Sequence, residues 1–98
     1  MTSGTARAIR INARDNCAVL LTDVKKGDPV EVRSDEGTSL LSARQAIASG
    51  HKIALAALAA DQPIIKYGEE IGRAQSAIEA GDWIHLHNVY CLRGHETP

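Results

Sequence analysis

The sequence has few aromatic side chains: phenylalanine is absent, and aromatics make up only 3% of its 98 residues. The core must therefore be built from Ile, Leu, Val and Ala, and there is no aromatic platform on which nucleic-acid bases could stack. No sign of charge dominates either, because the formal net charge is −1. We therefore expect neither a nucleic-acid partner nor attachment to a membrane surface.

Cysteines and long apolar runs are also scarce. Cys17 and Cys91 are too few and too far apart for a disulfide framework, so we interpret them as reduced, structural thiols. No apolar run approaches the ~20 residues that a membrane span needs, and residues 1–5 do not have the apolar character of a secretory signal. The expectation is one small cytoplasmic domain with a single modest core.

Short alternating segments predict a mainly β fold. Period-two alternation or a short apolar run, both typical of strands, occurs at residues 8–12, 17–21, 31–33, 50–55 and 81–88. Short helical turns are expected at residues 43–46 and 75–80. Residues 1–7 are expected to form a disordered lead-in, and residues 91–98 a polar tail.

A seven-residue frame recurs four times in the chain. It consists of an apolar residue, two spacers, a turn residue, two further residues and an apolar residue, at 24–30, 47–53, 58–64 and 78–84. Glycine at the turn position of most copies allows positive φ where the chain reverses. Each copy therefore predicts a one-turn connector that leads into a new strand, and the irregular spacing of the copies argues against a solenoid.

Two histidines alternate with apolar residues near the end of the chain. In residues 81–88, Ile84 and Leu86 alternate with His85 and His87. On a strand the two imidazoles would lie on one face, roughly 6–7 Å apart, where they could hold one metal ion or one anionic ligand. His-x-His is a weak motif by itself, so an amphipathic strand with two surface histidines is the plainer alternative.

The remaining candidates are cationic or metal-capable groups close to turns, because no GxGxxG, P-loop, CxxC or HExxH motif is present. Imidazoles are common ligands for Fe, Zn and Mn, and lysine is a compact positive partner for anions. If their strands are neighbours, these groups could converge on a carboxylate or a metal. For the lysines, plain surface solubility is the alternative. The candidates are His51, Lys52, Lys66, Tyr67, His85, His87 and Asn88.

Three ordered blocks carry a resemblance to a known family. They read Gly-His-Lys-Ile-Ala-Leu at residues 50–55, Ile-Lys-Tyr-Gly-x-x-Ile-Gly at residues 65–72, and His-x-His-Asn at residues 85–88. Together they resemble the N-terminal SAF module of the altronate/galactarate dehydratase family, which also occurs as a separate small subunit of altronate dehydratases and of sulfolactate sulfo-lyase. The resemblance covers residues 8–90. It implies an SAF-type β-clip fold of short strands and tight turns, with one or two short helices.

The same resemblance implies a metal-dependent lyase that acts on sugar acids by β-elimination of water, giving a 2-keto-3-deoxy acid. The family's large catalytic portion is absent from this chain. We therefore expect the chain to be inactive alone and to complete the active site of a large catalytic subunit or domain. It implies Fe(II) or Mn(II) in the complete enzyme and three sets of site residues: catalytic His51, Lys52 and Lys66; substrate-binding Tyr67, Gly68 and Asn88; metal-binding His85 and His87.

Several alternatives stay open at this point. The chain could be the small subunit of sulfolactate sulfo-lyase, a non-catalytic SAF module that binds an anionic carbohydrate, or a purely structural subunit with solvated histidines. The sequence also leaves open whether the chain is a free subunit or a piece of a longer enzyme. Self-association into a homo-oligomer is open in the same way.

Overall fold

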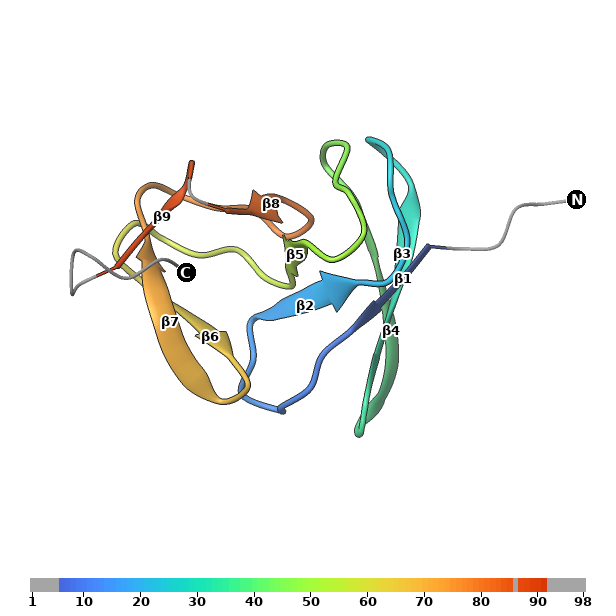
Figure 1. The fold of residues 1–98 in the computed structure, drawn as a ribbon, viewed down its shortest axis with the longest axis horizontal. Coiled ribbons are helices and arrows are strands. Elements are labelled where there is room, and N and C mark those ends of the chain that lie inside the picture. The colour runs from blue at the N-terminus through green and yellow to red at the C-terminus, as the bar shows by residue number, and fades with distance from the viewer. Residues whose placement is uncertain (1–5, 86, 92–98) are drawn as a thin grey trace, which may run out of the picture.

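A computed structural model describes residues 6–85 and 87–91, and these residues form nine short strands (Figure 1). None of the described residues is helical, so this part of the chain offers no helix that could cross a membrane. The mainly β fold expected from the sequence is confirmed. In chain order the strands are β1 (Ala6–Ile9), β2 (Cys17–Leu20), β3 (Pro29–Ser34), β4 (Gly37–Ser42), β5 (Lys52–Ala54), β6 (Pro63–Lys66), β7 (Glu69–Ala74), β8 (Trp83–Ile84) and β9 (Val89–Tyr90).

Two sheets hold these strands. The larger has the order β4-β3-β1-β2-β5-β8, in which β1 and β3 run parallel and all other neighbours antiparallel. The smaller has the order β6-β7-β9 and is antiparallel throughout. In Figure 1, β1, β3 and β4 lie toward one end of the long axis and β6, β7 and β9 toward the other, with β2, β5 and β8 between them. The central strands therefore connect the two ends of the molecule.

Two clusters of buried side chains lie on opposite faces of the central strands. Successive side chains of a strand point to opposite faces, so Ile53 and Ala54 of β5 belong to different clusters. No buried member of either cluster is aromatic, as expected from the composition, and the partly buried Trp83 packs against the first. The first comprises Ala8, Ala18, Leu20, Val24, Val30, Val32, Ala43, Ile47 and Ile53, and the second Cys17, Ala54, Leu58, Ile64, Ala74, Ile78, Ile84 and Val89.

The four copies of the seven-residue frame form one-turn connectors that lead into β3, β5, β6 and β8, as predicted. Their first residues pair two by two, Val24 with Ile47 and Leu58 with Ile78, through isolated antiparallel bridges. The turn residue has positive φ in every copy, from 72° to 93°. Positive φ at this position is the mark of a type II turn, which explains why glycine occupies it in most copies.

The paired connectors divide most of the chain into two equivalent units. We call residues 20–53 the first unit and residues 54–84 the second unit. In both, the turn residue donates its N–H to an alanine carbonyl beyond the hairpin: Gly27 to Ala43 at 2.7 Å and Asp61 to Ala74 at 2.8 Å. The two alanine N–H groups return matching bonds at 2.9 Å to the residue after the turn. Each unit is thus a connector, a hairpin and a second connector.

The short helices expected at residues 43–46 and 75–80 are wrong. Both segments are bends and turns between paired backbone positions. Ala43 and Ile47 donate across to Asp28 and Val24, and Ala74 and Ile78 make the corresponding bonds in the second unit. The residues between these backbone hydrogen bonds are too few to form a helix, because the first helical turn is unfavourable by itself.

The strand expected over residues 81–88 is also wrong in its second half. Strand β8 ends at Ile84, and the chain then turns, with Asn88 N–H donating to the His85 carbonyl at 3.0 Å. The positions of the His85 and His87 rings are therefore not set by the alternation of side chains along a strand. Leu86 lies outside the described residues. At the other end β1 begins at Ala6, so it includes the last two residues of the expected lead-in. Residues 1–5, and all of the expected polar tail except Cys91, lie outside the described residues.

Candidate functional site

Four rings gather beside β5 and β8, and we call them the imidazole–indole cluster: His51, Trp83, His85 and His87. The His85 ring stacks on the Trp83 indole with 5.1 Å between centroids and 9° between planes. The His87 ring lies 5.0 Å from the indole at 44°. His51 meets Trp83 and His85 edge-on, at centroid distances of 5.5 and 5.3 Å. The indole is therefore the common neighbour of all three imidazoles.

Strand pairing explains why the indole and the first imidazole meet. In the β5–β8 register Ile53 lies opposite Trp83, and paired residues share a face of the sheet. His51 precedes Ile53 by two residues and therefore faces the same side. The Trp83 Nε1–H donates to Nδ1 of His51 at 3.3 Å. His51 of the first unit and Trp83 of the second, which both follow the last turn of their unit, are thus brought into contact.

Two amide side chains hold this cluster in place. Trp83 N–H donates to Oε1 of Gln45 at 3.1 Å. Asn88 donates from Nδ2 to the Trp83 carbonyl at 2.8 Å and accepts the His85 N–H on Oδ1 at 3.0 Å. Both ends of the Asn88 amide are therefore bonded to the backbone of the cluster. Its observed role is to position the rings, and the substrate contact expected of it stays a prediction.

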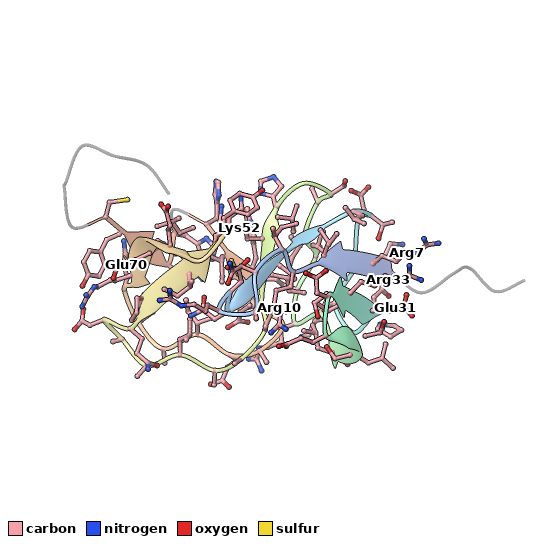
Figure 2. The ribbon with its side chains drawn as sticks, turned by 90° about the horizontal axis from the view of Figure 1, so that it is seen from below. Arg7, Arg10, Glu31, Arg33, Lys52 and Glu70 are labelled. Carbon is pink, nitrogen blue, oxygen red and sulfur yellow. The ribbon has the colours of Figure 1, made fainter. Side chains whose placement is uncertain are left out.

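Two lysines form a second group around β5 and β6. Lys52 pairs with Val19 and Ile84, so it points to the face of β5 opposite His51. Burial lowers the pKa of the Lys52 ammonium, and the nearby charge of Lys66 lowers it further. Figure 2 labels Lys52 near the middle of the molecule. Two neighbouring amines with reduced access to water favour an anion beside them, because an opposite charge stabilises their charged forms.

The thiol of Cys17 lies close to these amines. Burial raises its pKa to about 11, while the charge of Lys52 lowers it, that of Asp15 raises it and that of Lys66 lowers it. The Sγ atom lies 3.5 Å from the Ile65 carbonyl oxygen, to which it donates. Such a thiol stays protonated near neutral pH and is a poor nucleophile. The structure therefore agrees with a structural role for this cysteine.

A buried carboxylate fixes the turn after Lys66. Tyr67 and Gly68 have φ of 55° and 77°, as the two-residue type I′ hairpin loop requires. Asp15, only 5% exposed, accepts the Gly68 N–H at 2.8 Å and the Asn12 N–H at 3.1 Å. Tyr67 is 57% exposed, and its ring centroid lies 4.8 Å from the Lys66 ammonium. The tyrosine is free to meet a ligand, whereas the Gly68 N–H is already used by Asp15.

Comparison with known proteins gives the same family as the three sequence blocks. The family described as altronate/galactarate dehydratase SAF domain matches residues 6–92. The chain belongs to this family. The matched range spans both the imidazole–indole cluster and the lysine pair, so every predicted site residue falls inside the family's domain.

Individual relatives fall into two groups by length. Altronate dehydratase of Escherichia coli (strain K12) is 46% identical over 81 residues, which cover 83% of this chain and 16% of the relative. Galactarate dehydratase (L-threo-forming) of the same organism is 39% identical over 80 residues, covering 82% of this chain and 14% of the relative. (2R)-sulfolactate sulfo-lyase subunit alpha of Paracoccus pantotrophus is 44% identical over 62 residues, covering 63% of this chain and 92% of the relative. The chain thus spans about a sixth of the altronate dehydratases that it matches.

The described residues of this SAF domain do not make up a metal centre by themselves. Among residues 6–85 and 87–91, no group of three or more His, Cys, Asp or Glu side chains lies close enough together to hold a metal ion. His85 and His87 both lie against Trp83 and provide two imidazoles at most. A catalytic metal usually takes three protein ligands, so further ligands would have to come from outside this part of the chain.

The predicted site residues therefore separate into two groups. The structure brings His51, His85, His87 and Asn88 together around an indole. It places Lys52, Lys66, Tyr67 and Gly68 around β5, β6 and the turn after β6. Sequence reasoning missed the indole itself, although it is the chain's only tryptophan and stands within a histidine-rich segment. It also missed Gln45 and Asp15, which hold the two groups through backbone bonds that no sequence pattern indicated.

Proposed function

We propose that this SAF domain is the small subunit, or the N-terminal module, of a sugar-acid dehydratase of the altronate/galactarate type. In this proposal it completes the active site of a large catalytic subunit or domain. Family membership supports it, and so do the relatives named as dehydratases. The single observation that carries the proposal is the cluster of three imidazoles around Trp83, on a domain that also carries the pair Lys52 and Lys66 on the opposite face of β5. Such groups suit an anionic, polyhydroxylated substrate.

Each group has a distinct task in the proposed β-elimination. The proton on the carbon next to a carboxylate passes to a base, the bond from the next carbon to its hydroxyl breaks, and the departing hydroxide takes up a proton and leaves as water. The resulting enol then becomes the 2-keto-3-deoxy acid. Lys66 binds the carboxylate as a cation, with Tyr67 beside it. Lys52 is suited to proton transfer, because its lowered pKa increases the neutral fraction that can accept a proton.

A divalent metal, Fe(II) or Mn(II), belongs to the complete enzyme in this proposal. When bound, such an ion polarises the substrate's oxygens. We propose that His85 and His87 contribute ligands to it and that the large subunit provides the others. The described residues do not form a complete ligand set, so the tasks of Lys52 and Lys66 are assigned without reference to the metal.

The test is reconstitution with a large subunit of the family, followed by assays of water elimination from altronate and galactarate. His51→Ala, Lys52→Met and the double variant His85→Ala, His87→Ala should each lower activity by at least about tenfold. Lys26→Met, at an exposed connector position that belongs to neither group, is the matched control and should retain full activity. Full activity in the histidine double variant would contradict the metal assignment, and full activity in all three would contradict the proposed site.

A second candidate is the small subunit of a sulfolactate sulfo-lyase, because this chain covers 92% of one such subunit. Sulfite would then leave in place of water, and the same reconstitution distinguishes the two by assaying for sulfite or for the keto acid. Binding of galactarate by the chain without any partner or metal would instead favour a non-catalytic carbohydrate-binding module. A cytoplasmic location is part of the proposal and agrees with the two free thiols.

A further inference from the structure

One connector departs from the other three at the position after its turn residue. Asp28, Gln62 and Asp82 each use a side-chain oxygen to accept the N–H of the residue that opens their own turn, at 2.8, 2.6 and 2.7 Å. His51 occupies the equivalent position in the remaining connector and bonds to Trp83 instead. The chain thus forgoes a local turn bond here in favour of a contact between the two units.

That contact determines which nitrogen of His51 carries the proton. Trp83 Nε1–H can only donate, so Nδ1 of His51 must be the acceptor. A neutral imidazole that accepts at Nδ1 carries its hydrogen on Nε2. Among the described residues no hydrogen bond engages Nε2. His51 therefore presents an N–H donor rather than a lone pair.

The indole is well placed to enforce this arrangement. Its backbone N–H and carbonyl are hydrogen-bonded to Gln45 and Asn88. Its ring packs against the stacked His85 ring and against the tilted His87 ring. A donor that is itself held rigidly restricts both the orientation and the tautomer of its acceptor. The cluster consequently holds His51 in one chemical form.

We propose that Trp83 is a positioning residue that fixes His51 as an Nε2–H donor, and that the acceptor is a carboxylate oxygen of the substrate. This inference rests on the proposed function for the choice of a sugar acid. It assigns His51 to substrate binding and excludes it as a metal ligand, since a metal would need the lone pair that the Nε2–H form lacks. It also leaves proton abstraction to Lys52.

The first experiment observes the hydrogen bond in the metal-free chain. Because the chain has one tryptophan, its spectrum has one indole N–H resonance, and a hydrogen bond should shift this resonance downfield and slow its exchange with water. His51→Asn retains an acceptor near the place of Nδ1 and should keep the shift. His51→Gln, which retains a donor near the place of Nε2, should lose it, as should His51→Ala. An indole resonance that is the same in all four proteins would overturn the inference.

The second experiment measures galactarate binding by calorimetry on the complex with the large subunit, which does not require turnover. The Asn and Gln variants should rank in the opposite order to the first experiment. His51→Asn should weaken binding as much as His51→Ala, whereas His51→Gln should retain most of the affinity. Trp83→Phe, which keeps a ring but has no N–H, should weaken binding about 3- to 10-fold and have no further effect in a His51→Ala background. Equal losses in the Asn and Gln variants would overturn the inference.

The two experiments separate this inference from the proposed function. If galactarate binds in the expected order but no elimination occurs, the dehydratase assignment fails and the inference about Trp83 and His51 stands. If elimination proceeds while Trp83→Phe leaves both the affinity and the KM unchanged, the inference fails and the proposed function stands. If galactarate, altronate and sulfolactate all fail to bind, the inference is overturned in its choice of a carboxylate acceptor.

Discussion

The first unit (residues 20–53) and the second unit (residues 54–84) share a backbone frame but differ in the residues directly after their last turn. The second unit ends its connector with Asp82, which bonds to its own turn, and then Trp83. The first unit has His51 and Lys52 at the equivalent places, and neither side chain bonds to the local turn in the described structure. The imidazole–indole cluster therefore lies where the units meet, at His51, which does not make the side-chain turn bond of the equivalent residues in the other three connectors.

The units also differ at their hairpins. In the second unit β7 pairs with β9 on one side, so that Val89 is buried. In the first unit β4 is the outermost strand of the larger sheet among the described residues, and Leu40 is 70% exposed. Equivalent hairpins thus differ in their surroundings, while the paired connectors between them are alike. The connectors are the element that the two units share most closely.

Equivalent glycines should reveal the largest difference between the units. Gly50 and Gly81 have φ of 87° and 93°. A Cβ at Gly50 meets nothing within 4 Å, whereas one at Gly81 would collide with the Ser42 carbonyl oxygen. Gly50→Ala should therefore cost only the strain of positive φ, about 1–2 kcal/mol. Gly81→Ala should cost more than about 4 kcal/mol, as measured by urea unfolding.

Gly27→Ala provides the control for this pair. Gly27 has φ of 91° and open space around its Cβ position, so its variant should lose as much stability as Gly50→Ala. Equal losses at Gly50 and Gly81 would mean that the close approach of Ser42 to the second connector is not maintained in solution.

The two thiols should differ in reaction rate by a large factor. The Cys17 pKa is raised from 9.0 to about 11, which lowers its thiolate fraction at pH 8 about 100-fold relative to an ordinary thiol. Cys91 is only partly buried and should react first with iodoacetamide, followed by mass spectrometry. The Cys91→Ser variant isolates the slow reaction of Cys17. A rate at Cys17 equal to that of a small-molecule thiol would contradict the burial described for β2.

The same shift has a consequence for stability. Because the folded state raises the Cys17 pKa, the unfolded state loses this proton more readily between pH 9 and about pH 11. The contribution of the protonated thiol is therefore fully present below pH 9 and declines as the pH rises through that window. A Cys17→Ala variant should show a smaller decline over the same range in urea unfolding.

The repeated frame was predictable because its signal is local. Apolar residues at fixed spacing, with glycine at the turn, indicate each connector without reference to the rest of the chain. The pairing of Val24 with Ile47 has no such local signal, and that pairing replaced the expected helical turn at residues 43–46. The strand predicted through His85 and His87 was wrong for a similar reason. Asn88 closes a turn there, and period-two alternation does not indicate that turn.

The sequence indicated candidate site residues but not their division into two groups. Local motifs identified His51 and Lys52 together, yet neighbouring residues near the start of a strand face opposite sides. Only the register of β5 against β8 shows that one of them meets Trp83. The carboxylate of Asp15 fixes a turn more than fifty residues away, and a contact at that separation leaves no trace in a short motif.

A moderate difference is expected at the turn bonds themselves. Asp82→Ala removes both the bond to Glu79 N–H at 2.7 Å and the ion pair with Arg44 at 2.9 Å. The loss should be about 1–2 kcal/mol in urea unfolding. Arg44→Ala removes only the ion pair, which is partly exposed, and should cost less than about 1 kcal/mol. If the two variants lose the same stability, the turn bond at Asp82 contributes nothing, and its absence at His51 would carry no stability cost.

The smallest effect concerns Lys52, the counterpart of Trp83 in the first unit. Burial, followed by the charge of Lys66, lowers the Lys52 pKa from 10.5, so the unfolded state binds this proton more tightly than the folded state. Charged Lys52 therefore destabilises the fold at neutral pH, and stability should rise as the pH increases toward 10.5. Lys52→Met should raise the free energy of unfolding at pH 7 by under about 1 kcal/mol, with the gain vanishing above pH 10.5.

The contribution of Lys66 can be separated by titrating Lys52 with NMR. In Lys66→Met the Lys52 pKa should move up toward 10.5 but not reach it, because burial is the larger cause of the shift and remains. Bound galactarate should also raise it, since a carboxylate between the two amines favours their charged forms. An unchanged Lys52 pKa in both cases would mean that the lysines do not share an anion site, and would contradict the task proposed for Lys52 beside the substrate.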